Sequence, residues 1–399
     1  MASLLRSAHA RRVVRLVHLQ GVDSRAAIAE ATGMSTSLVS RVTAELLRRG
    51  VLAARSDGGA RPGRPTERLS LQPSAGHVIG VEVARDDVRF VRTDARGDVV
   101  TRWHRDGGMG QPSEAAIRDL SQDVAAAAAG RDDPPLLAVG AALPEVVTAS
   151  GAWRRTDGRG ADVPAAELLA DALDVPVVVD DVSRAFADAE HRFGAGRDAP
   201  DMIYVFLGRE GVGSGVFAGD APLRSRSGIC GEIGHVVVEP GGALCTCGNR
   251  GCLETVATHE ALLRRARGYL DQGVQSTLAP DAGVHELLGA GRDGDKVATL
   301  VLHDLAHHLR DALTPAVALT GATTVVLGGD VRESGPSLPA LLTEQLKRTA
   351  LPPLAAHVRA RWAELDRDAG ARGVAVAALD AAVAGGTWLR RYEEGAIAM

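Results

Sequence analysis

GEIGHVVVEPGGALCTCGNRGCLE, residues 231–254, is the stretch from which the fold of this chain can be inferred. It holds three of the four cysteines, Cys245, Cys247 and Cys252, with His235 ten residues before the first. Three thiolates and an imidazole form the closed tetrahedral ligand set of a structural Zn²⁺ ion. Glycines between the last two cysteines allow the tight backbone turn that such a site needs. The alternative is a cluster of buried free thiols, but this spacing favours zinc.

The same stretch resembles the signature of the ROK family, in which Gly-Glu-Ile-Gly-His precedes Cys-x-Cys-Gly-x-x-Gly-Cys-Leu-Glu. That family contains sugar kinases and sugar-responsive transcriptional repressors. The resemblance covers roughly residues 78–384. It implies that zinc shapes a sugar pocket and that Glu232, His235 and Glu254 contact sugar hydroxyls.

Length and composition place the chain among soluble globular proteins. Its 399 residues exceed one ordinary core and predict two or three domains. It is 45% hydrophobic and 24% charged, and no window approaches the roughly 18 apolar residues of a membrane span. The arginines near the N-terminus alternate with apolar residues, unlike a signal peptide. Few cysteines, mostly in one metal-like cluster, predict a reducing cytoplasm.

Charge is distributed unevenly along the chain. Residues 1–72 contain 12 Arg and five acidic residues, a net charge of +7, whereas the whole chain carries −5 and the remainder therefore −12. A basic module on an acidic body predicts a polyanionic partner. The alternative is a solvated basic face without a specific partner.

The basic module has the pattern of a helix-turn-helix. Apolar periodicity and capping residues predict helices over residues 7–20, 24–33 and 35–50. In this unit the second helix of the pair enters the major groove with its N-terminal residues toward the bases. The predicted DNA-contacting residues of that helix are Ser35, Thr36, Ser37, Ser40, Arg41 and Thr43.

A basic hairpin follows the third helix. Two short strands at residues 51–52 and 69–71 flank SDGGARPGRPTER, which resembles the wing of a winged helix. We expect Arg61, Arg64 and Arg68 to contact the DNA backbone or a minor groove. The alternative is a three-helix protein–protein module. The predicted DNA-binding domain spans residues 1–72 and is followed by a linker at 73–76.

The position that resembles the phosphate loop of ROK kinases lacks the residues needed to bind phosphate. In the kinases a strand leads into Asp-x-Gly-x-Thr, where this chain has Glu82, Ala84 and Asp86. Without the glycine, backbone amides cannot approach a phosphate closely, and the carboxylates would repel it. Glu145 stands where the family commonly has glycine, and residues 209–210 (Arg-Glu) replace Gly-Thr. These differences predict that the chain is not an active kinase.

Asp180-Asp181 resembles the Asn-Asp pair that follows a strand in the family. In the kinases the second carboxylate is the general base that deprotonates the sugar hydroxyl. Without a phosphoryl donor, we assign Asp181, together with Asp180, to sugar binding. The alternative is that the pair caps the following helix.

These features predict an α/β chain in which a winged helix-turn-helix precedes an actin-like (ribonuclease H-like) body of two lobes. The small lobe is expected at residues 77–185, the large lobe with the zinc loop at 186–385, and a tail at 386–399. The predicted function is a non-enzymatic transcriptional regulator, a repressor, of sugar metabolism. It would act in the cytoplasm at the nucleoid and bind operator DNA as a homodimer or homotetramer, with a sugar or sugar derivative as effector. The alternatives are an ATP-dependent sugar kinase with a DNA-binding domain and a ligand-independent regulator.

Overall fold

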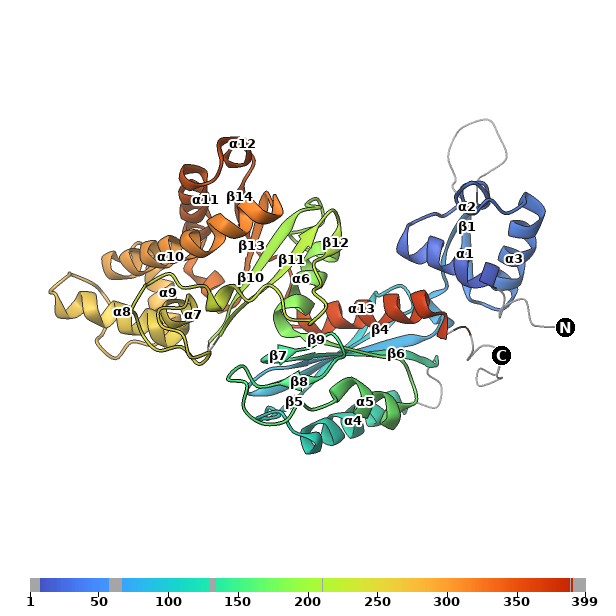
Figure 1. The fold of residues 1–399 in the computed structure, drawn as a ribbon, viewed down its shortest axis with the longest axis horizontal. Helices are drawn as coiled ribbons and strands as arrows, with labels where there is room; N and C mark the ends of the chain where they lie inside the picture. The colour runs from blue at the N-terminus through green and yellow to red at the C-terminus, as the bar shows by residue number, and fades with distance from the viewer. Residues whose placement is uncertain (1–7, 57–66, 130–133, 210, 388, 390–399) are drawn as a thin grey trace. The chain divides into compact units, whose positions relative to one another are not determined.

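The computed structural model describes residues 8–56, 67–129, 134–209, 211–387 and 389, and the chain divides into two compact units (Figure 1). The first unit comprises Met1–Pro144, Val163–Asp180 and Ala371–Met399, and the second comprises Glu145–Asp162 and Asp181–Gly370. This division differs from the predicted lobes. It falls at residue 181 rather than 185, and it places Glu145–Asp162 in the second unit. It also groups the N-terminal module and the helix after residue 370 with the first unit.

The N-terminal module contains the three predicted helices and the two strands of the hairpin. They are α1 (Ala8–Leu19), α2 (Arg25–Thr32), α3 (Thr36–Arg48), β1 (Leu52–Ser56) and β2 (Glu67–Leu71). The Ser24 side chain caps α2 and Gly33 ends it at φ +70°, as expected from the sequence. Of the two candidate caps for α3, Ser35 and Thr36, Ser35 is the one that caps the helix. β1 and β2 pair antiparallel. Arg61 and Arg64 lie outside the described residues.

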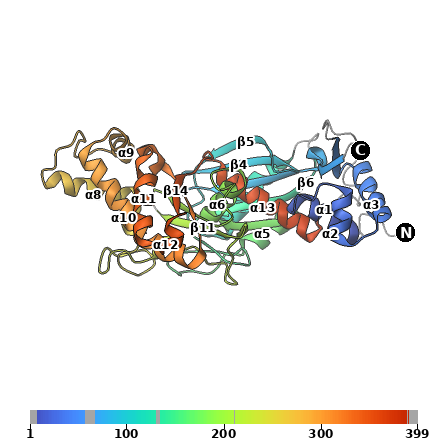
Figure 2. The ribbon, with the colours of Figure 1, turned by 90° about the horizontal axis from the view of Figure 1, so that it is seen from above.

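A five-stranded sheet is the centre of the first unit. Its order is β5-β4-β3-β6-β9, with β3 antiparallel to β4 and parallel to β6. Helices α4 and α5 lie on one face and α13 lies on the other (Figures 1 and 2). Their bounds are η2 Pro73–Ala75, β3 His77–Val83, β4 Asp87–Asp94, β5 Val99–Asp106, α4 Glu114–Ala128, β6 Leu136–Leu143, α5 Ala165–Leu173, β9 Val177–Asp181 and α13 Ala369–Gly385.

Two glycines explain why α13 packs on this sheet. Gly80 of β3 and Gly140 of β6 are paired across the parallel strands. A Cβ atom at Gly80 would overlap the carbonyl oxygen of Ala371, and one at Gly140 would overlap that of Val374. The backbone of α13 therefore lies directly on the sheet, which places this helix in the first unit.

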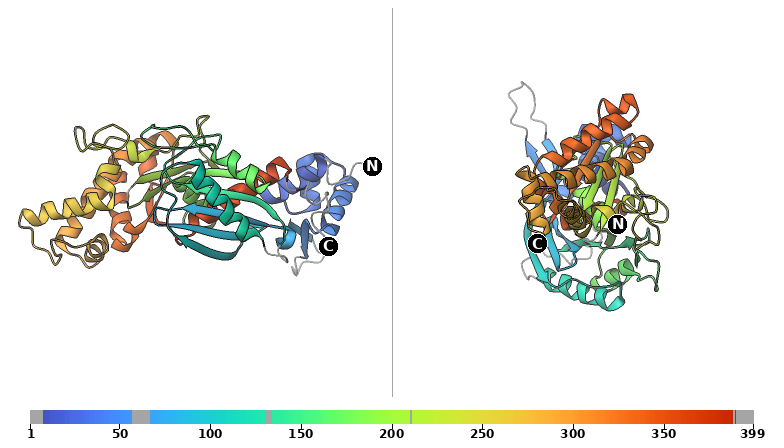
Figure 3. Two further views of the ribbon diagram at one scale, coloured as in Figure 1. Left: turned by 90° about the horizontal axis from the view of Figure 1, so that it is seen from below. Right: turned by 90° about the vertical axis from the view of Figure 1, so that its left-hand side faces the viewer.

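The second unit is built on a sheet of order β12-β11-β10-β13-β14. Alternate side chains of β10 enter different cores: Ile203 and Val205 join the core that contains α10, whereas Met202 and Tyr204 join the core that contains α6. Figure 3 shows the ribbon from two further sides, with α6 in green and α10 in orange as in Figure 1. The bounds are β7 Val146–Val147, β8 Trp153–Arg154, α6 Val182–Phe193, β10 Met202–Leu207, β11 Val212–Ala218, β12 Ala221–Pro222, η3 Ile233–His235, α7 Glu254–Ala257, α8 His259–Asp271, α9 Val284–Arg292, α10 Lys296–Thr320, β13 Thr324–Gly328, η4 Asp330–Ser334, α11 Ser337–Thr349, α12 Pro352–Ala355 and β14 Arg359–Trp362.

Among the described residues, no helix has both the length and the hydropathy required to cross a membrane.

We predict that Gly80→Ala destabilises the protein by about 1–3 kcal/mol, because the added methyl group overpacks the contact between β3 and α13. Gly268→Ala is the matched control, since Gly268 lies inside α8 with open space around its Cβ position. That change should be neutral or stabilise by up to about 1 kcal/mol. Urea unfolding of the full chain measures both. Equal stability of the two variants would contradict the close packing of α13.

Candidate functional site

The predicted metal ligands lie together in the second unit. His235 Nδ1 and Cys245 Sγ are 3.5 Å apart, and the Sγ atoms of Cys247 and Cys252 are 3.7 Å apart. All four ligand atoms lie within 4.8 Å of one another. A tetrahedron with metal–sulfur bonds of about 2.3 Å has edges of about 3.8 Å. The cluster therefore has the donors and the spacing to hold a metal ion.

The loop backbone explains why these side chains converge. Gly248 and Gly251 adopt φ values of +91° and +74°, which glycine alone adopts at little cost. A side chain at Gly251 would overlap the carbonyl oxygen of Glu239. An isolated bridge between Val237 and Cys252 holds the two ends of the loop together. The sulfurs are thus brought together by turns that the sequence specifies.

The protein surroundings shift the pKa values of the three thiols in different directions. Burial, and then hydrogen bonds with the other two cysteines, raises the pKa of Cys252 to about 12. Burial also raises the pKa of Cys245, whereas the Asn249 backbone amide lowers the pKa of Cys247. A bound metal cation would favour the thiolate form of all three, which agrees with the geometric fit.

The three residues predicted to contact sugar hydroxyls lie on the same loop as the cluster. Glu232 precedes η3, His235 ends it, and Glu254 begins α7. Glu254 Oε2 accepts from the Val212 backbone amide at 3.2 Å, and its Oε1 accepts from the Thr246 hydroxyl at 3.3 Å. Glu254 is therefore fixed between β11 and the loop of residues 236–253, which carries the three clustered cysteines and is called the cysteine loop below.

Glu232 reaches solvent, yet the surrounding protein changes its ionisation. Partial desolvation is the largest effect and raises the pKa of its carboxyl group, and nearby Glu254 adds to the increase. The charges of His235 and Arg184 oppose it by lowering the same pKa. His235, Arg184 and Glu254 are thus close enough to Glu232 for their charges to affect its ionisation.

Asp181 caps α6 and also pairs with a buried arginine. Its Oδ1 accepts from the Arg184 backbone amide at 2.9 Å, and its Oδ2 lies 2.7 Å from Arg184 Nε. The same guanidinium donates to the carbonyl oxygens of Gly228 and Val147. The Arg184 guanidinium therefore balances the charge of Asp181 inside the second unit. Capping, the alternative reading of Asp180-Asp181, is present at Asp181.

Asp180 is 7% exposed and belongs to the first unit. Its contribution to a sugar site that includes the loop of the second unit stays a prediction.

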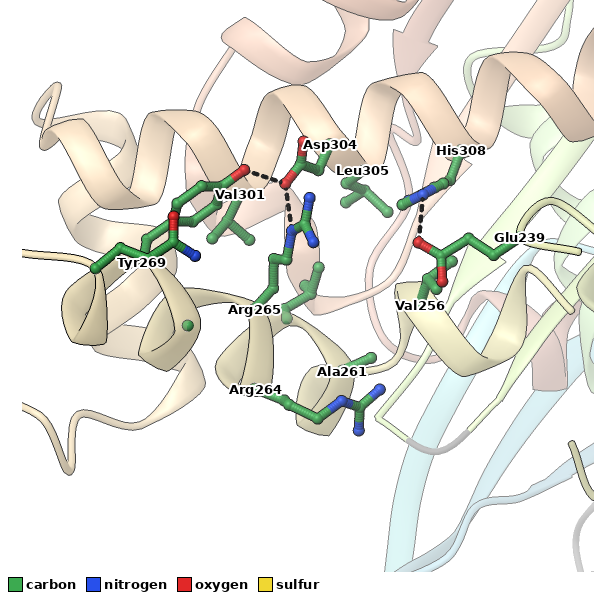
Figure 4. Close-up of a pocket in the computed structure, with 13 residues that line it drawn as sticks. Glu239, Val256, Ala261, Arg264, Arg265, Tyr269, Val301, Asp304, Leu305 and His308 are labelled. Carbon is green, nitrogen blue, oxygen red and sulfur yellow. Dashed lines mark hydrogen bonds and ion pairs between the residues drawn. The ribbon is translucent and has the colours of Figure 1, made fainter. Parts of the chain in front are cut away.

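A pocket of about 370 Å³ lies between α8 and α10 and is bordered by the cysteine loop at Glu239 (Figure 4). Tyr269 Oη and Arg265 Nε both donate to Asp304 Oδ2, at 2.6 and 2.5 Å. His308 Nε2 lies 3.1 Å from Glu239 Oε1. These pairs join side chains of the pocket wall to one another, and the His308–Glu239 contact holds the cysteine loop against α10.

An ion-pair cluster joins the end of β3 to the start of β4, at the position that resembles the phosphate loop of the kinases. Arg89 lies 2.8 Å from Glu82 and 3.0 Å from Asp87, and Glu82 is only 2% exposed. A buried carboxylate at this position is unfavourable for phosphate binding. Glu145 has φ +64°, so it retains a backbone conformation typical of glycine. Glu210 lies outside the described residues.

The N-terminal module exposes most of the predicted DNA-contacting residues. Those exposed on and before α3 are Ser35, Thr36, Ser37, Ser40 and Arg41.

Thr43 is a correction to the predicted set of DNA contacts. It is fully buried, its hydroxyl donates to the Val39 carbonyl oxygen at 2.9 Å, and it accepts from Arg25 Nε at 3.0 Å. Thr43 therefore belongs to the interior of the module. Arg68, predicted at the wing tip, lies on β2 and pairs with Asp23 at 2.7 Å.

Two functional arginines were missed by sequence reasoning. Arg25 joins α2 to Thr43 of α3 and to Glu67 of β2, and Arg184 holds Asp181. The spacing of Asp181 and Arg184 is a possible signal for a helical i,i+3 pair. The contacts of Arg25 involve residues 18 and 42 positions away, so no local pattern indicates them.

Comparison with known proteins identifies the family. Residues 78–381 match the ROK family. The chain is 28% identical over 375 residues to the DNA-binding transcriptional dual regulator NagC of Escherichia coli K12, covering 91% of this chain and 90% of NagC. It is 28% identical to a glucokinase of Halalkalibacterium halodurans, covering 80% of this chain and 96% of that enzyme.

A solved structure described as a ROK family transcriptional regulator, a homolog of E. coli MLC, shares this fold. It matches with a TM-score of 0.82 and 22% identity over 97% of this chain and 98% of that chain. Since the family match covers most of the chain and includes the cysteine loop, this protein is a member of the ROK family.

Proposed function

We propose that this chain is a DNA-binding transcriptional regulator, a repressor whose operator affinity responds to a sugar or sugar derivative. The observation that carries the proposal is that the similarity to NagC extends over 91% of the chain, more than the ROK body at residues 78–381 alone. The exposed N-terminal end of α3 supports major-groove binding. Operator binding implies action at the nucleoid in the cytoplasm, as a homodimer or homotetramer matched to paired half-sites.

The effector is proposed to bind at Glu232, His235 and Glu254, with Asp181 and Asp180 as further hydroxyl acceptors. Carboxylates and imidazole suit the hydroxyl groups of a sugar. Relatives are named for N-acetylglucosamine, xylose and glucose, and these three sugars form the first set of candidates.

We assign Zn²⁺ to the cluster of His235, Cys245, Cys247 and Cys252. Closed sets of three cysteines and one histidine are typical of structural zinc. When bound, the ion would stabilise the loop that carries Glu232 and Glu254.

The second candidate function is an ATP-dependent sugar kinase, favoured by the glucokinase relative and by Asp181. The ion-pair cluster of Glu82, Arg89 and Asp87 weighs against it. A coupled assay decides: formation of ADP with any of the three sugars, abolished by Asp181→Asn, would establish the kinase. The third candidate is a regulator without a ligand.

The zinc assignment predicts that Cys247→Ser lowers the zinc content and the thermal stability, because structural zinc contributes directly to folding free energy. Cys230→Ser is the matched control. Cys230 lies outside the cluster and donates to the Leu223 carbonyl oxygen, a bond that serine can keep. Elemental analysis and thermal unfolding measure both variants. Unchanged zinc content in Cys247→Ser would show that the site is misassigned.

The sensor assignment predicts that one sugar of the panel stabilises the protein without ATP, by about 2.7 kcal/mol at a concentration of 100 Kd. Glu232→Gln should lose about 1.5–3 kcal/mol of binding free energy with the loss of a charged hydrogen bond. Glu260→Gln, at an exposed position on α8, is the control. Thermal shift with and without Mg-ATP is the measurement. Stabilisation by ATP alone would favour the kinase, and no response to any sugar would favour the ligand-independent regulator.

The DNA-binding assignment predicts that Arg41→Ala weakens binding to a fragment of the protein's own promoter region. If Arg41 contacts a phosphate, the slope of log K against log salt also falls by about 1. Arg348→Ala, the same charge change at an exposed position on α11, is the control. Fluorescence anisotropy over a salt series measures both. Equal losses in the two variants would indicate a general charge effect rather than a contact by α3.

A further inference from the structure

The DNA-binding module and the C-terminal helix of the body share one hydrophobic core. The buried residues of α1 join that core, and the α13 residues that join it recur at helical spacing along one side of the helix. The members of the shared cluster from these two helices are Ala10, Val13, Val14, Leu16, Val17, Ala375, Ala378, Leu379, Ala382 and Val383. The module is therefore packed against the body through α1, while the outer side of α3 stays exposed.

One polar contact lies within this apolar interface. His18 Nε2, in the last turn of α1, is 2.8 Å from Asp380 Oδ1 of α13. Their side chains are only 11% and 19% exposed. A poorly hydrated carboxylate is costly unless it keeps a partner. Rotation or sliding of α1 along α13 would break the contact, so the pair favours a single docked arrangement.

A second contact holds the other side of the module. Arg96, in the turn between β4 and β5, donates to the Leu71 carbonyl oxygen at 3.1 Å and to the Ser70 hydroxyl at 2.8 Å. Both acceptors belong to β2, so the wing strand is fixed to the body sheet independently of α1.

The other end of α13 has little freedom to move on the sheet. The carbonyl oxygens of Ala371 and Val374 lie where Gly80 and Gly140 have no side chain. The chain passes from the second unit to the first between Gly370 and Ala371, in the first turn of α13. Because packed interfaces shift between discrete arrangements rather than deform continuously, α13 and the docked α1 should move together.

We propose that α13 orients the DNA-binding module and that His18 and Asp380 are the positioning residues that fix this orientation for operator binding. The inference rests on the proposed function as a DNA-binding regulator. It assigns to these two residues a role that does not involve contact with DNA or sugar.

The test uses the full chain with His18→Ala, Asp380→Ala, the double variant and Asp380→Asn, whose amide oxygen can still accept from the imidazole. His9→Ala, at an exposed position on the same helix, is the control. Hydrogen exchange of residues 8–19 reports docking without DNA. The second readout is the ratio of affinities for the promoter fragment and for a shuffled fragment of equal length.

We expect each alanine variant to exchange faster over residues 8–19 and to lose about tenfold in the affinity ratio, within the usual range of coupling between sites. Affinity for the shuffled fragment should not change. The double variant should be no worse than either single one, because both remove the same contact. Asp380→Asn should keep most of the ratio, and His9→Ala all of it.

Unchanged exchange and an unchanged ratio in either alanine variant would overturn the proposal. Additive losses in the double variant would do the same, because they would show that the residues act separately. If the wild-type protein does not prefer the promoter fragment, the proposed function fails, whereas the exchange data still decide whether the pair docks α1 on α13.

Discussion

The convergence of three thiols and one imidazole within 4.8 Å is the constraint on which the candidate site depends. The same loop carries Glu232 and Glu254, and the position of Glu254 is fixed further by the Val212 amide. Burial raises the pKa values of Cys245 and Cys252 and so disfavours their thiolate forms. A bound metal cation would favour the thiolates instead. The proposed metal ligands and two of the proposed sugar contacts therefore lie on one loop.

Two carboxylates of the body are each compensated by a neighbouring arginine. Where phosphates would approach, Glu82 is buried and compensated by Arg89. At the position of the general base, Asp181 is compensated by Arg184. Both carboxylates have gained an internal cation. The proposal of a sugar-responsive regulator rather than a kinase draws on these two internal ion pairs.

The parts that sequence predicted well are those with local signals. Ser24, Gly33 and Ser35 mark helix ends by their own chemistry, and the cysteine spacing specifies the cluster. Thr43 was wrongly predicted to face DNA, because its hydroxyl is consumed by Arg25 from another helix. The alanine-rich helix α13 was predicted as a helix but assigned to the wrong unit. The apolar residues of α13 do not show by themselves which sheet the helix packs on. The close contacts of its backbone with Gly80 of β3 and Gly140 of β6 assign it to the sheet of the first unit.

The position of α13 also affects the order in which the protein can fold during synthesis. The first unit combines residues before 145 and residues 163–180 with residues after 370, so both segments of the second unit are translated before the first unit is complete. The sheet face that contains Val78 and Ala138 stays uncovered until α13 has emerged from the ribosome. α1 likewise lacks its docking surface until then. A chain interrupted before this helix would expose that apolar surface, the kind of surface that leads to aggregation and engages chaperones.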